Sequence, residues 1–117
     1  MKKSNHKDKS FQERLDESKK ILSKYPERAC LFIEKMETCK DLPDLNKNKY
    51  LVPKSITAAE LILVIRNKIK IPKEKAIFFY VNKTIISGNV TINEINENNK
   101  NNDGFLYIKY TGEDCFG

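Results

Sequence analysis

The chain has 117 residues, of which 39% are hydrophobic and 32% charged, and its formal net charge is +6. This length predicts one domain with a single modest core, and no apolar stretch approaches the roughly 20 residues that a membrane-spanning helix needs. The first ten residues lack the apolar segment of a secretory signal, so we expect a cytoplasmic protein.

The positive charge is concentrated in the first half of the chain. Residues 1 to 54 hold 14 Lys and Arg against 9 Asp and Glu, whereas residues 55 to 117 hold 8 against 7. A basic surface favours acidic peptides, anionic lipid head groups or nucleic acid as partners. The alternative is a charged surface that only keeps the protein soluble.

Few residues are suited to catalysis or to metal binding. Cys30, Cys39 and Cys115 are an odd number of cysteines without the spacing of a metal site, so we expect reduced thiols. His6 is the only histidine, in a basic tail that we expect to be mobile, and no ligand lies near it in the sequence. Cys115 has no histidine partner and is interpreted as an exposed tail thiol. The sequence predicts a non-enzyme without catalytic residues, metal or cofactor.

The chain opens with a predicted amphipathic helix. Apolar residues recur at helical spacing from residue 11 to residue 25, Ser10 precedes them as a candidate N-cap, and Pro26 ends the pattern. Residues 29 to 33 then form a short apolar run typical of a buried strand, with Cys30 and every second residue on one face.

A strand, a helix and a further strand follow. Residues 50 to 53 predict a second strand, which ends at a proline. Thr57 and Glu60 match the capping box of a helix start, and we expect about twelve helical residues through Ile69. Residues 77 to 81 are apolar and aromatic and predict a central strand.

The last third of the chain predicts a short helix and a final strand. Residues 82 and 83 are interpreted as a turn. Thr91 and Glu94 form a second capping box, and this helix should end in the polar run from residue 96 to residue 103. This asparagine-rich run is interpreted as a loop without chemistry, and residues 105 to 110 predict the last strand.

The order of these elements indicates an α+β fold of the ubiquitin-like β-grasp type. We expect a four-stranded mixed sheet with a crossing helix, plus an N-terminal helical extension. The predicted boundaries are a basic tail and helical subdomain over residues 1–25, the β-grasp domain over residues 26–110, and a flexible conjugation tail over residues 111–117.

Eight short strings carry a resemblance to a known family: Lys24-Tyr25-Pro26-Glu27-Arg28, Ile33-Glu34-Lys35, Asp44-Leu45 with Lys47, Lys49-Tyr50-Leu51-Val52-Pro53, Ile65-Arg66, Phe78-Phe79-Tyr80-Val81-Asn82, Phe105-Leu106-Tyr107-Ile108 and Phe116-Gly117. Together they resemble the autophagy ubiquitin-like modifiers, the family of GABA-A receptor-associated protein and microtubule-associated protein light chain three. The resemblance runs from about residue 11 to residue 117.

The resemblance implies conjugation through Gly117 to phosphatidylethanolamine on autophagic or related organelle membranes. A glycine carboxylate has no side chain beside it, so an activating enzyme can adenylate it and transfer it with little steric hindrance. The implied partners are the activating and conjugating enzymes, a processing and deconjugating cysteine protease, and adaptor proteins. We expect a cytoplasmic monomer that becomes membrane-associated after lipidation and does not bind nucleic acid.

The resemblance also implies a docking groove for aromatic-x-x-aliphatic peptides with acidic flanks, which add to the edge of the second strand. The implied aromatic pocket contains Glu17, Ile21, Cys30, Lys49, Leu51 and Phe105. The implied aliphatic pocket contains Tyr50, Val52, Pro53, Ile56, Leu61 and Val64, with Arg66 nearby. Arg28, Lys47 and Lys49 would contact the acidic flank. The alternative is that Ile56, Leu61, Val64 and Phe105 are ordinary core residues.

Two departures from the family pattern and two alternative functions remain. Cys30 stands where the family typically has proline, which frees a backbone N–H and alters the aromatic pocket. The start of the chain lacks clear apolar anchors, so the first short helix of the family would be absent or mobile. The alternatives are a non-conjugated peptide-binding scaffold and a β-grasp modifier attached to a protein lysine.

Overall fold

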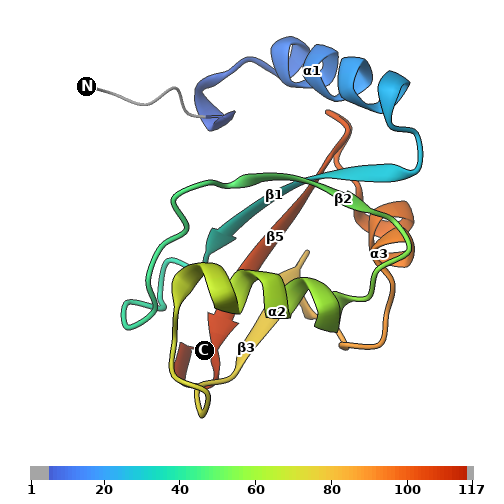
Figure 1. The fold of residues 1–117 in the computed structure, drawn as a ribbon. Helices are drawn as coiled ribbons and strands as arrows, with labels where there is room; N and C mark the ends of the chain where they lie inside the picture. The colour runs from blue at the N-terminus through green and yellow to red at the C-terminus, as the bar shows by residue number, and fades with distance from the viewer. Residues whose placement is uncertain (1–5, 116–117) are drawn as a thin grey trace.

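The computed structural model describes residues 6–115 (Figure 1). Its elements in chain order are η1 (His6–Asp8), α1 (Phe11–Lys24), β1 (Arg28–Lys35), β2 (Lys49–Pro53), α2 (Ala58–Ile69), β3 (Ile77–Val81), β4 (Thr84–Ile85), α3 (Ile92–Asn99), β5 (Phe105–Gly112) and η2 (Glu113–Cys115). The predicted helices and strands are all present, with ends that agree with the prediction or shift by a few residues.

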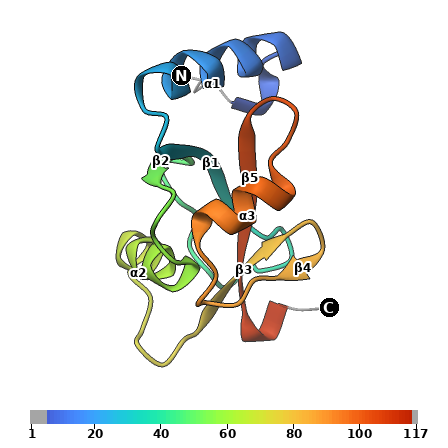
Figure 2. The ribbon, with the colours of Figure 1, turned by 90° about the vertical axis from the view of Figure 1, so that its right-hand side faces the viewer.

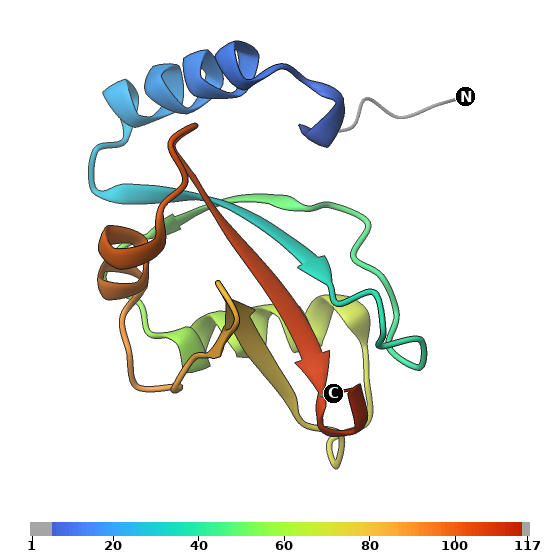
Figure 3. The ribbon, with the colours of Figure 1, turned by 180° about the vertical axis from the view of Figure 1, so that it is seen from behind.

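The sheet has the order β2-β1-β5-β3-β4. Strands β1 and β5 are parallel and the other neighbours are antiparallel, and Figure 3 shows β5 between β1 and β3. The predicted α+β ubiquitin-like arrangement with an N-terminal helical extension is confirmed. The sheet has a fifth strand, which the sequence analysis did not predict. Asn82 and Lys83 form the predicted turn with φ angles of 47° and 67°, and they fold the exposed residues of β4 back onto β3.

Each α-helix begins at a capping box, in which the side chain of the N-cap and the glutamate three residues later satisfy free backbone amides. The three pairs are Ser10 with Glu13, Thr57 with Glu60, and Thr91 with Glu94. The second and third boxes are confirmed predictions. At the first box, only the cap residue had been predicted.

Two layers of side chains pack on the two faces of the sheet. The main core lies between the sheet and α2, where Leu31, Leu61, Ile65 and Phe79 are fully buried (Figures 1 and 2). Helix α1 lies on the opposite side and buries only Ser18 completely. Apolar burial therefore holds α2 more firmly than α1, whose apolar residues Leu15, Ile21 and Leu22 are only partly buried.

Three predictions about the chain ends and the cysteines need correction. His6 lies in η1 and is only 3% exposed, so the prediction of a mobile tail was wrong for this residue. Strand β5 continues to Gly112, two residues into the predicted tail, and η2 follows it. Cys39 and Cys115 form a disulfide, so the expectation of reduced thiols holds only for Cys30. Their contact joins segments 76 residues apart, which spacing arguments do not reveal.

We predict that Leu61→Ala lowers the free energy of unfolding by about 2–5 kcal/mol, because it opens a cavity in the main core. Leu61 is 1% exposed, whereas Leu63 on the same helix is 61% exposed. Leu63→Ala is therefore the matched control and should change stability by less than about 0.5 kcal/mol. Urea denaturation followed by circular dichroism measures both, and equal effects would contradict the assignment of Leu61 to the core.

Candidate functional site

The site begins at the edge of the sheet. Strand β2 is the outermost strand beside β1, so the backbone groups on its outer side face away from the sheet. Leu51 of β2, Cys30 of β1 and Phe105 of β5 stand in one row across three strands. Side chains paired in this way point to the same face. That face is the one covered by α1.

A second row lies beside the first on the same face. It consists of Lys49, Phe32 and Tyr107, again in register across β2, β1 and β5. We call these two rows the aromatic layer. The predicted alternation in β1 is confirmed, since Cys30 and Phe32 belong to this layer while Leu31 belongs to the main core.

Helix α1 reaches the aromatic layer through Glu17. Its carboxylate lies 2.9 Å from Lys49 Nζ and 3.1 Å from Lys9 Nζ. Partial burial alone would raise the pKa of Glu17, but hydrogen bonds from Lys49 and Lys9 outweigh it and lower the pKa. The structure thus brings Glu17, Lys49, Cys30, Leu51 and Phe105 of the predicted aromatic pocket together. Ile21, the sixth predicted residue, is half-buried on α1.

His6 fills the space above the aromatic layer. Its ring stacks on Phe32 with centroids 4.9 Å apart and meets Phe105 edge-on at 4.4 Å. Its Nε2 lies 2.9 Å from Tyr107 Oη. His6 was not predicted to belong to the site, although the alternation of Phe105 and Tyr107 was a signal that an aromatic surface outside the main core needs a cover.

One acidic residue connects the N-terminal segment to β5. Asp103 is fully buried and accepts hydrogen bonds from Arg14 Nε at 2.8 Å and from Tyr107 Oη at 2.5 Å. Its carbonyl accepts a third from Ser18 Oγ at 2.7 Å. Gly104 follows with a φ of 89°, and a Cβ there would stand 2.1 Å from Ser18 Oγ. The asparagine-rich run was predicted to be a loop without chemistry. Its last residues, 100–103, do form a loop, but Asp103 there has a structural role that was not predicted.

The hydrogen bonds fix the state of the His6 ring. Tyr107 donates its proton to Asp103, so the contact with His6 requires a proton on Nε2. The other ring nitrogen, Nδ1, is buried and finds no hydrogen-bond partner among the described residues. Burying an unpaired polar atom costs roughly 1–3 kcal/mol. The ring contacts of His6 therefore stabilise the docked N-terminal segment, and the buried Nδ1 without a described partner offsets part of that stabilisation.

The residues predicted to form the aliphatic pocket lie partly in the main core and partly on the surface. Val52 and Leu61 are buried in the main core, as the alternative interpretation held for Leu61. Pro53 and Val64 are exposed. The partly buried side chains, Tyr50 and Ile56, pack against the core from its edge.

Cations surround Tyr50 at this edge. Lys47 Nζ lies 5.8 Å and Lys68 Nζ 5.9 Å from the centre of its ring. Lys68 comes from α2, so this contact connects the helix with the edge strand, and it was not predicted. Arg66, expected nearby, donates instead to backbone carbonyls of Pro72, Lys73 and Lys75 and fixes the loop after α2.

The three residues expected to meet an acidic flank have different surroundings. Arg28 stacks over the ring of exposed Tyr25 at 5.7 Å, Lys47 lies over Tyr50, and Lys49 is paired with Glu17. All three lie on or beside the β1–β2 hairpin.

One group among the described residues has the composition of a metal site. The ligand atoms of Cys39, Asp41 and Cys115 lie within 4.8 Å of one another, but both sulfur atoms are joined in the disulfide. In the described part of the chain, no helix is long and apolar enough to cross a membrane.

We predict that the pKa of His6 lies below its ordinary value of 6.5. Burial is the main cause, followed by the positive charges of Lys49 and Arg14, against the opposing carboxylates of Glu17 and Asp103. Because the undocked imidazole binds protons more readily, docking of η1 is complete above pH 6.5 and weakens as the pH falls below it.

An NMR titration of the Cε1 proton measures this pKa without ambiguity, since the chain has one histidine. Phe32→Ala removes the ring that stacks on His6 and reduces its burial, so it should move the midpoint towards 6.5, while Tyr80→Phe on β3 should leave it unchanged. A midpoint at or above 6.5 in the unmodified protein would contradict the buried position.

Comparisons with known proteins agree with this geometry. The family described as "Autophagy protein Atg8 ubiquitin like" matches residues 13–117. Autophagy-related protein 8 of Mycosarcoma maydis is 41% identical over 108 residues, which cover 92% of this chain and 91% of that protein. Autophagy-related protein 8B of Oryza sativa subsp. indica is 42% identical over 110 residues, covering 94% and 92%.

The crystal structure of Trypanosoma brucei ATG8 is similar throughout. It superimposes with a TM-score of 0.88 at 32% identity and covers 99% of this chain and 100% of that one. The predicted resemblance is thereby confirmed: the chain belongs to the Atg8 family of ubiquitin-like autophagy proteins.

Proposed function

We propose that this protein is a non-enzymatic modifier that is conjugated through Gly117 to phosphatidylethanolamine and recruits adaptors carrying aromatic-x-x-aliphatic motifs. Membership of the Atg8 family, whose match extends to residue 117, supports the conjugation. The observation that carries the recruitment is the position of β2, an edge strand flanked by the aromatic layer on one face and by Tyr50 on the other.

The docking peptide adds to β2 as a further strand. Its backbone pairs with the outer side of β2, and its alternating side chains reach the two faces. The aromatic residue enters the aromatic layer between α1 and the sheet, and the aliphatic residue lies against Tyr50, Ile56 and Val64. Acidic flanking residues meet Arg28, Lys47 and Lys49, which raise the association rate more than the affinity.

His6 competes with the peptide for the aromatic layer. Its ring covers Phe32 and Phe105, so an incoming aromatic side chain must displace it. The unpaired Nδ1 makes this displacement less costly than the loss of the stacking contacts alone suggests. The peptide pocket of this protein is thus closed by its own N-terminal segment until a motif binds.

The proposed life cycle follows from these assignments. The protein is made in the cytoplasm, its terminal glycine is activated and transferred by dedicated enzymes, and a cysteine protease processes or releases it. Membrane attachment comes from the conjugated lipid. A protein that binds motifs but never forms the conjugate would instead act as a soluble scaffold.

Gly117→Ala is predicted to abolish the lipid conjugate, because an added methyl group hinders transfer of the carboxylate. Gly112→Ala is the matched control: a Cβ there meets its neighbours at 3.7 Å or more, an ordinary contact. Mass spectrometry of the tryptic peptide from residue 110 to residue 117, taken from membrane and soluble fractions, identifies the lipid on the glycine. A lipid-bearing form of the Gly117→Ala protein would refute the proposal.

Leu51→Ala and His6→Ala are predicted to change peptide affinity in opposite directions. Loss of Leu51 removes one wall of the aromatic pocket and should weaken an aromatic-x-x-aliphatic peptide at least tenfold, or about 1.4 kcal/mol. Loss of His6 removes the competitor and should tighten binding. Calorimetry measures both, with Ile85→Ala on the exposed β4 edge as the control. Unchanged affinity in both variants would show that the peptide binds elsewhere.

A further inference from the structure

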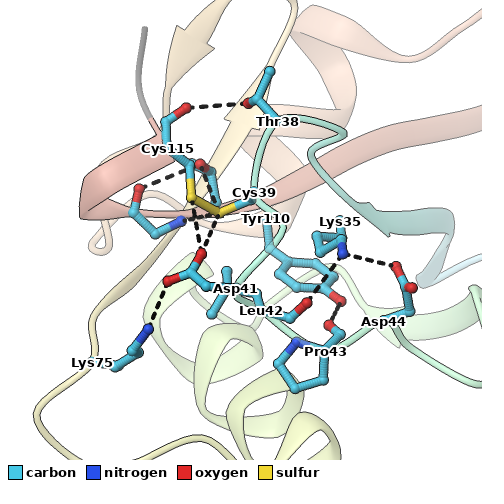
Figure 4. Close-up of a disulfide and its surroundings, with 12 residues drawn as sticks. Lys35, Thr38, Cys39, Asp41, Leu42, Pro43, Asp44, Lys75, Tyr110 and Cys115 are labelled. Carbon is cyan, nitrogen blue, oxygen red and sulfur yellow. Dashed lines mark hydrogen bonds and ion pairs between the residues drawn. A yellow bond between two sulfur atoms is a disulfide. The ribbon is translucent and has the colours of Figure 1, made fainter.

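A disulfide joins the end of the chain to the loop after β1. Cys39 and Cys115 have Cα atoms 5.0 Å apart, within the usual range for a disulfide, and lie 76 residues apart in the sequence (Figure 4). Cys39 is fully buried and Cys115 is half-buried. Cytosolic disulfides are usually transient and either catalytic or redox-sensing, so the pair is suited to reversible oxidation.

The two sulfur atoms differ in how firmly the protein holds them. Cys39 Sγ accepts a hydrogen bond from the Gly112 N–H at 3.3 Å, and its own N–H donates to the Met36 carbonyl at 3.0 Å. It is therefore fixed with or without the disulfide. Besides the disulfide, the carbonyl of Cys115 accepts a long hydrogen bond of 3.3 Å from the exposed Thr38 hydroxyl. The disulfide is thus the main contact that holds η2 against the rest of the protein, and we call it the tether.

The tether lies close to the conjugated residue. Gly117 is two positions after Cys115 in the sequence, a span of about 7 Å in extended chain. Without the tether the chain is anchored at the end of β5, at Gly112, and five residues span about 17 Å. Oxidation therefore reduces the reach of Gly117 by more than half.

We propose that Cys39 and Cys115 are a reversible thiol–disulfide pair that controls conjugation, the disulfide form being a poor substrate for the activating enzyme. An adenylating enzyme must take the terminal carboxylate into a nucleotide site, and the disulfide limits how far that carboxylate can extend from Cys39. This inference rests on the proposed conjugation through Gly117.

Oxidised glutathione is the oxidant that forms the disulfide between Cys39 and Cys115. The more accessible Cys115 thiolate attacks one glutathione sulfur, forms a mixed disulfide and releases one glutathione thiolate. The Cys39 thiolate then attacks Cys115 Sγ and releases the second. Two protein thiols are oxidised, one glutathione disulfide is reduced, and the two thiol protons pass to the departing thiolates. Asp41 Oδ1, 3.6 Å from Cys115 Sγ, is placed to accept a hydrogen bond from the reduced thiol.

The first experiment tests the pair without any enzyme. The full chain is equilibrated in buffers of increasing ratio of oxidised to reduced glutathione, quenched with an alkylating reagent and analysed by mass spectrometry. We expect loss of two hydrogen atoms in one step and a cross-linked peptide containing Cys39 and Cys115. Cys30→Ala should titrate identically, because Cys30 is buried at a different place. Glutathione adducts without the cross-link, at every ratio, would overturn the pair.

The second experiment tests control of conjugation. The protein is oxidised or reduced, freed of glutathione so that the cysteine of the activating enzyme is not affected, and assayed for thioester formation with that enzyme. We expect the disulfide form to react at least tenfold more slowly than the reduced form. Cys115→Ser, which cannot form the tether, should react at the reduced rate after either treatment.

These two experiments distinguish a failure of redox control from a failure of conjugation itself. Equal rates for the oxidised and reduced forms would overturn control by the tether while leaving conjugation intact. Absence of thioester from the reduced form and from Cys115→Ser alike would overturn conjugation itself, and control with it. The glutathione titration would still decide whether the cysteine pair is redox-active.

Discussion

The attachment of the N-terminal helix depends on the buried Asp103 carboxylate. Helix α1 buries only Ser18 completely, its apolar Leu15, Ile21 and Leu22 are partly buried and Phe11 is about half exposed, so polar contacts add to its attachment. Asp103 supplies such contacts, because it binds Arg14 of α1 and Tyr107 of β5 at once. Burial alone would raise the pKa of Asp103, but the hydrogen bonds to its carboxylate outweigh it and lower the pKa. Asp103 therefore stays charged although it is buried, and its hydrogen bonds keep α1 in place over the aromatic layer.

This arrangement distinguishes the main core from the first and last described segments, η1 and η2. The main core between α2 and the sheet is apolar and closed, whereas η1 and η2 are held by a few directional contacts. Segments of this kind open locally at a lower free energy than the whole protein unfolds. At the start of the chain, His6 closes the aromatic layer. At the other end, the disulfide fixes η2. Both segments lie beside the parts of the surface on which the proposed function depends.

The elements predicted correctly are those whose signals are local. Thr57 and Thr91 begin helices because their partners stand three residues away, and the apolar run of β3 needs no distant contact to be a strand. The features that were not predicted depend on contacts between residues far apart in the sequence. His6 and Tyr107 are 101 residues apart, and Arg14 and Asp103 are 89 apart. Leu61 was assigned to the aliphatic pocket by the family resemblance, with the core as the alternative, and its apolar side chain fits both places, so the sequence could not decide between them.

The odd number of cysteines is explained by the different surroundings of the three thiols. Cys30 lies in the row between Leu51 and Phe105, and burial raises its pKa to about 11, so it remains a neutral thiol at cellular pH. A thiol that is neither ionised nor accessible does not exchange with disulfides. Cys30 therefore acts as a small side chain of the aromatic layer, in a strand where its backbone N–H is available for pairing. Cys39 is equally buried, but its Cα lies 5.0 Å from that of Cys115, so these two thiols can react with each other inside the protein.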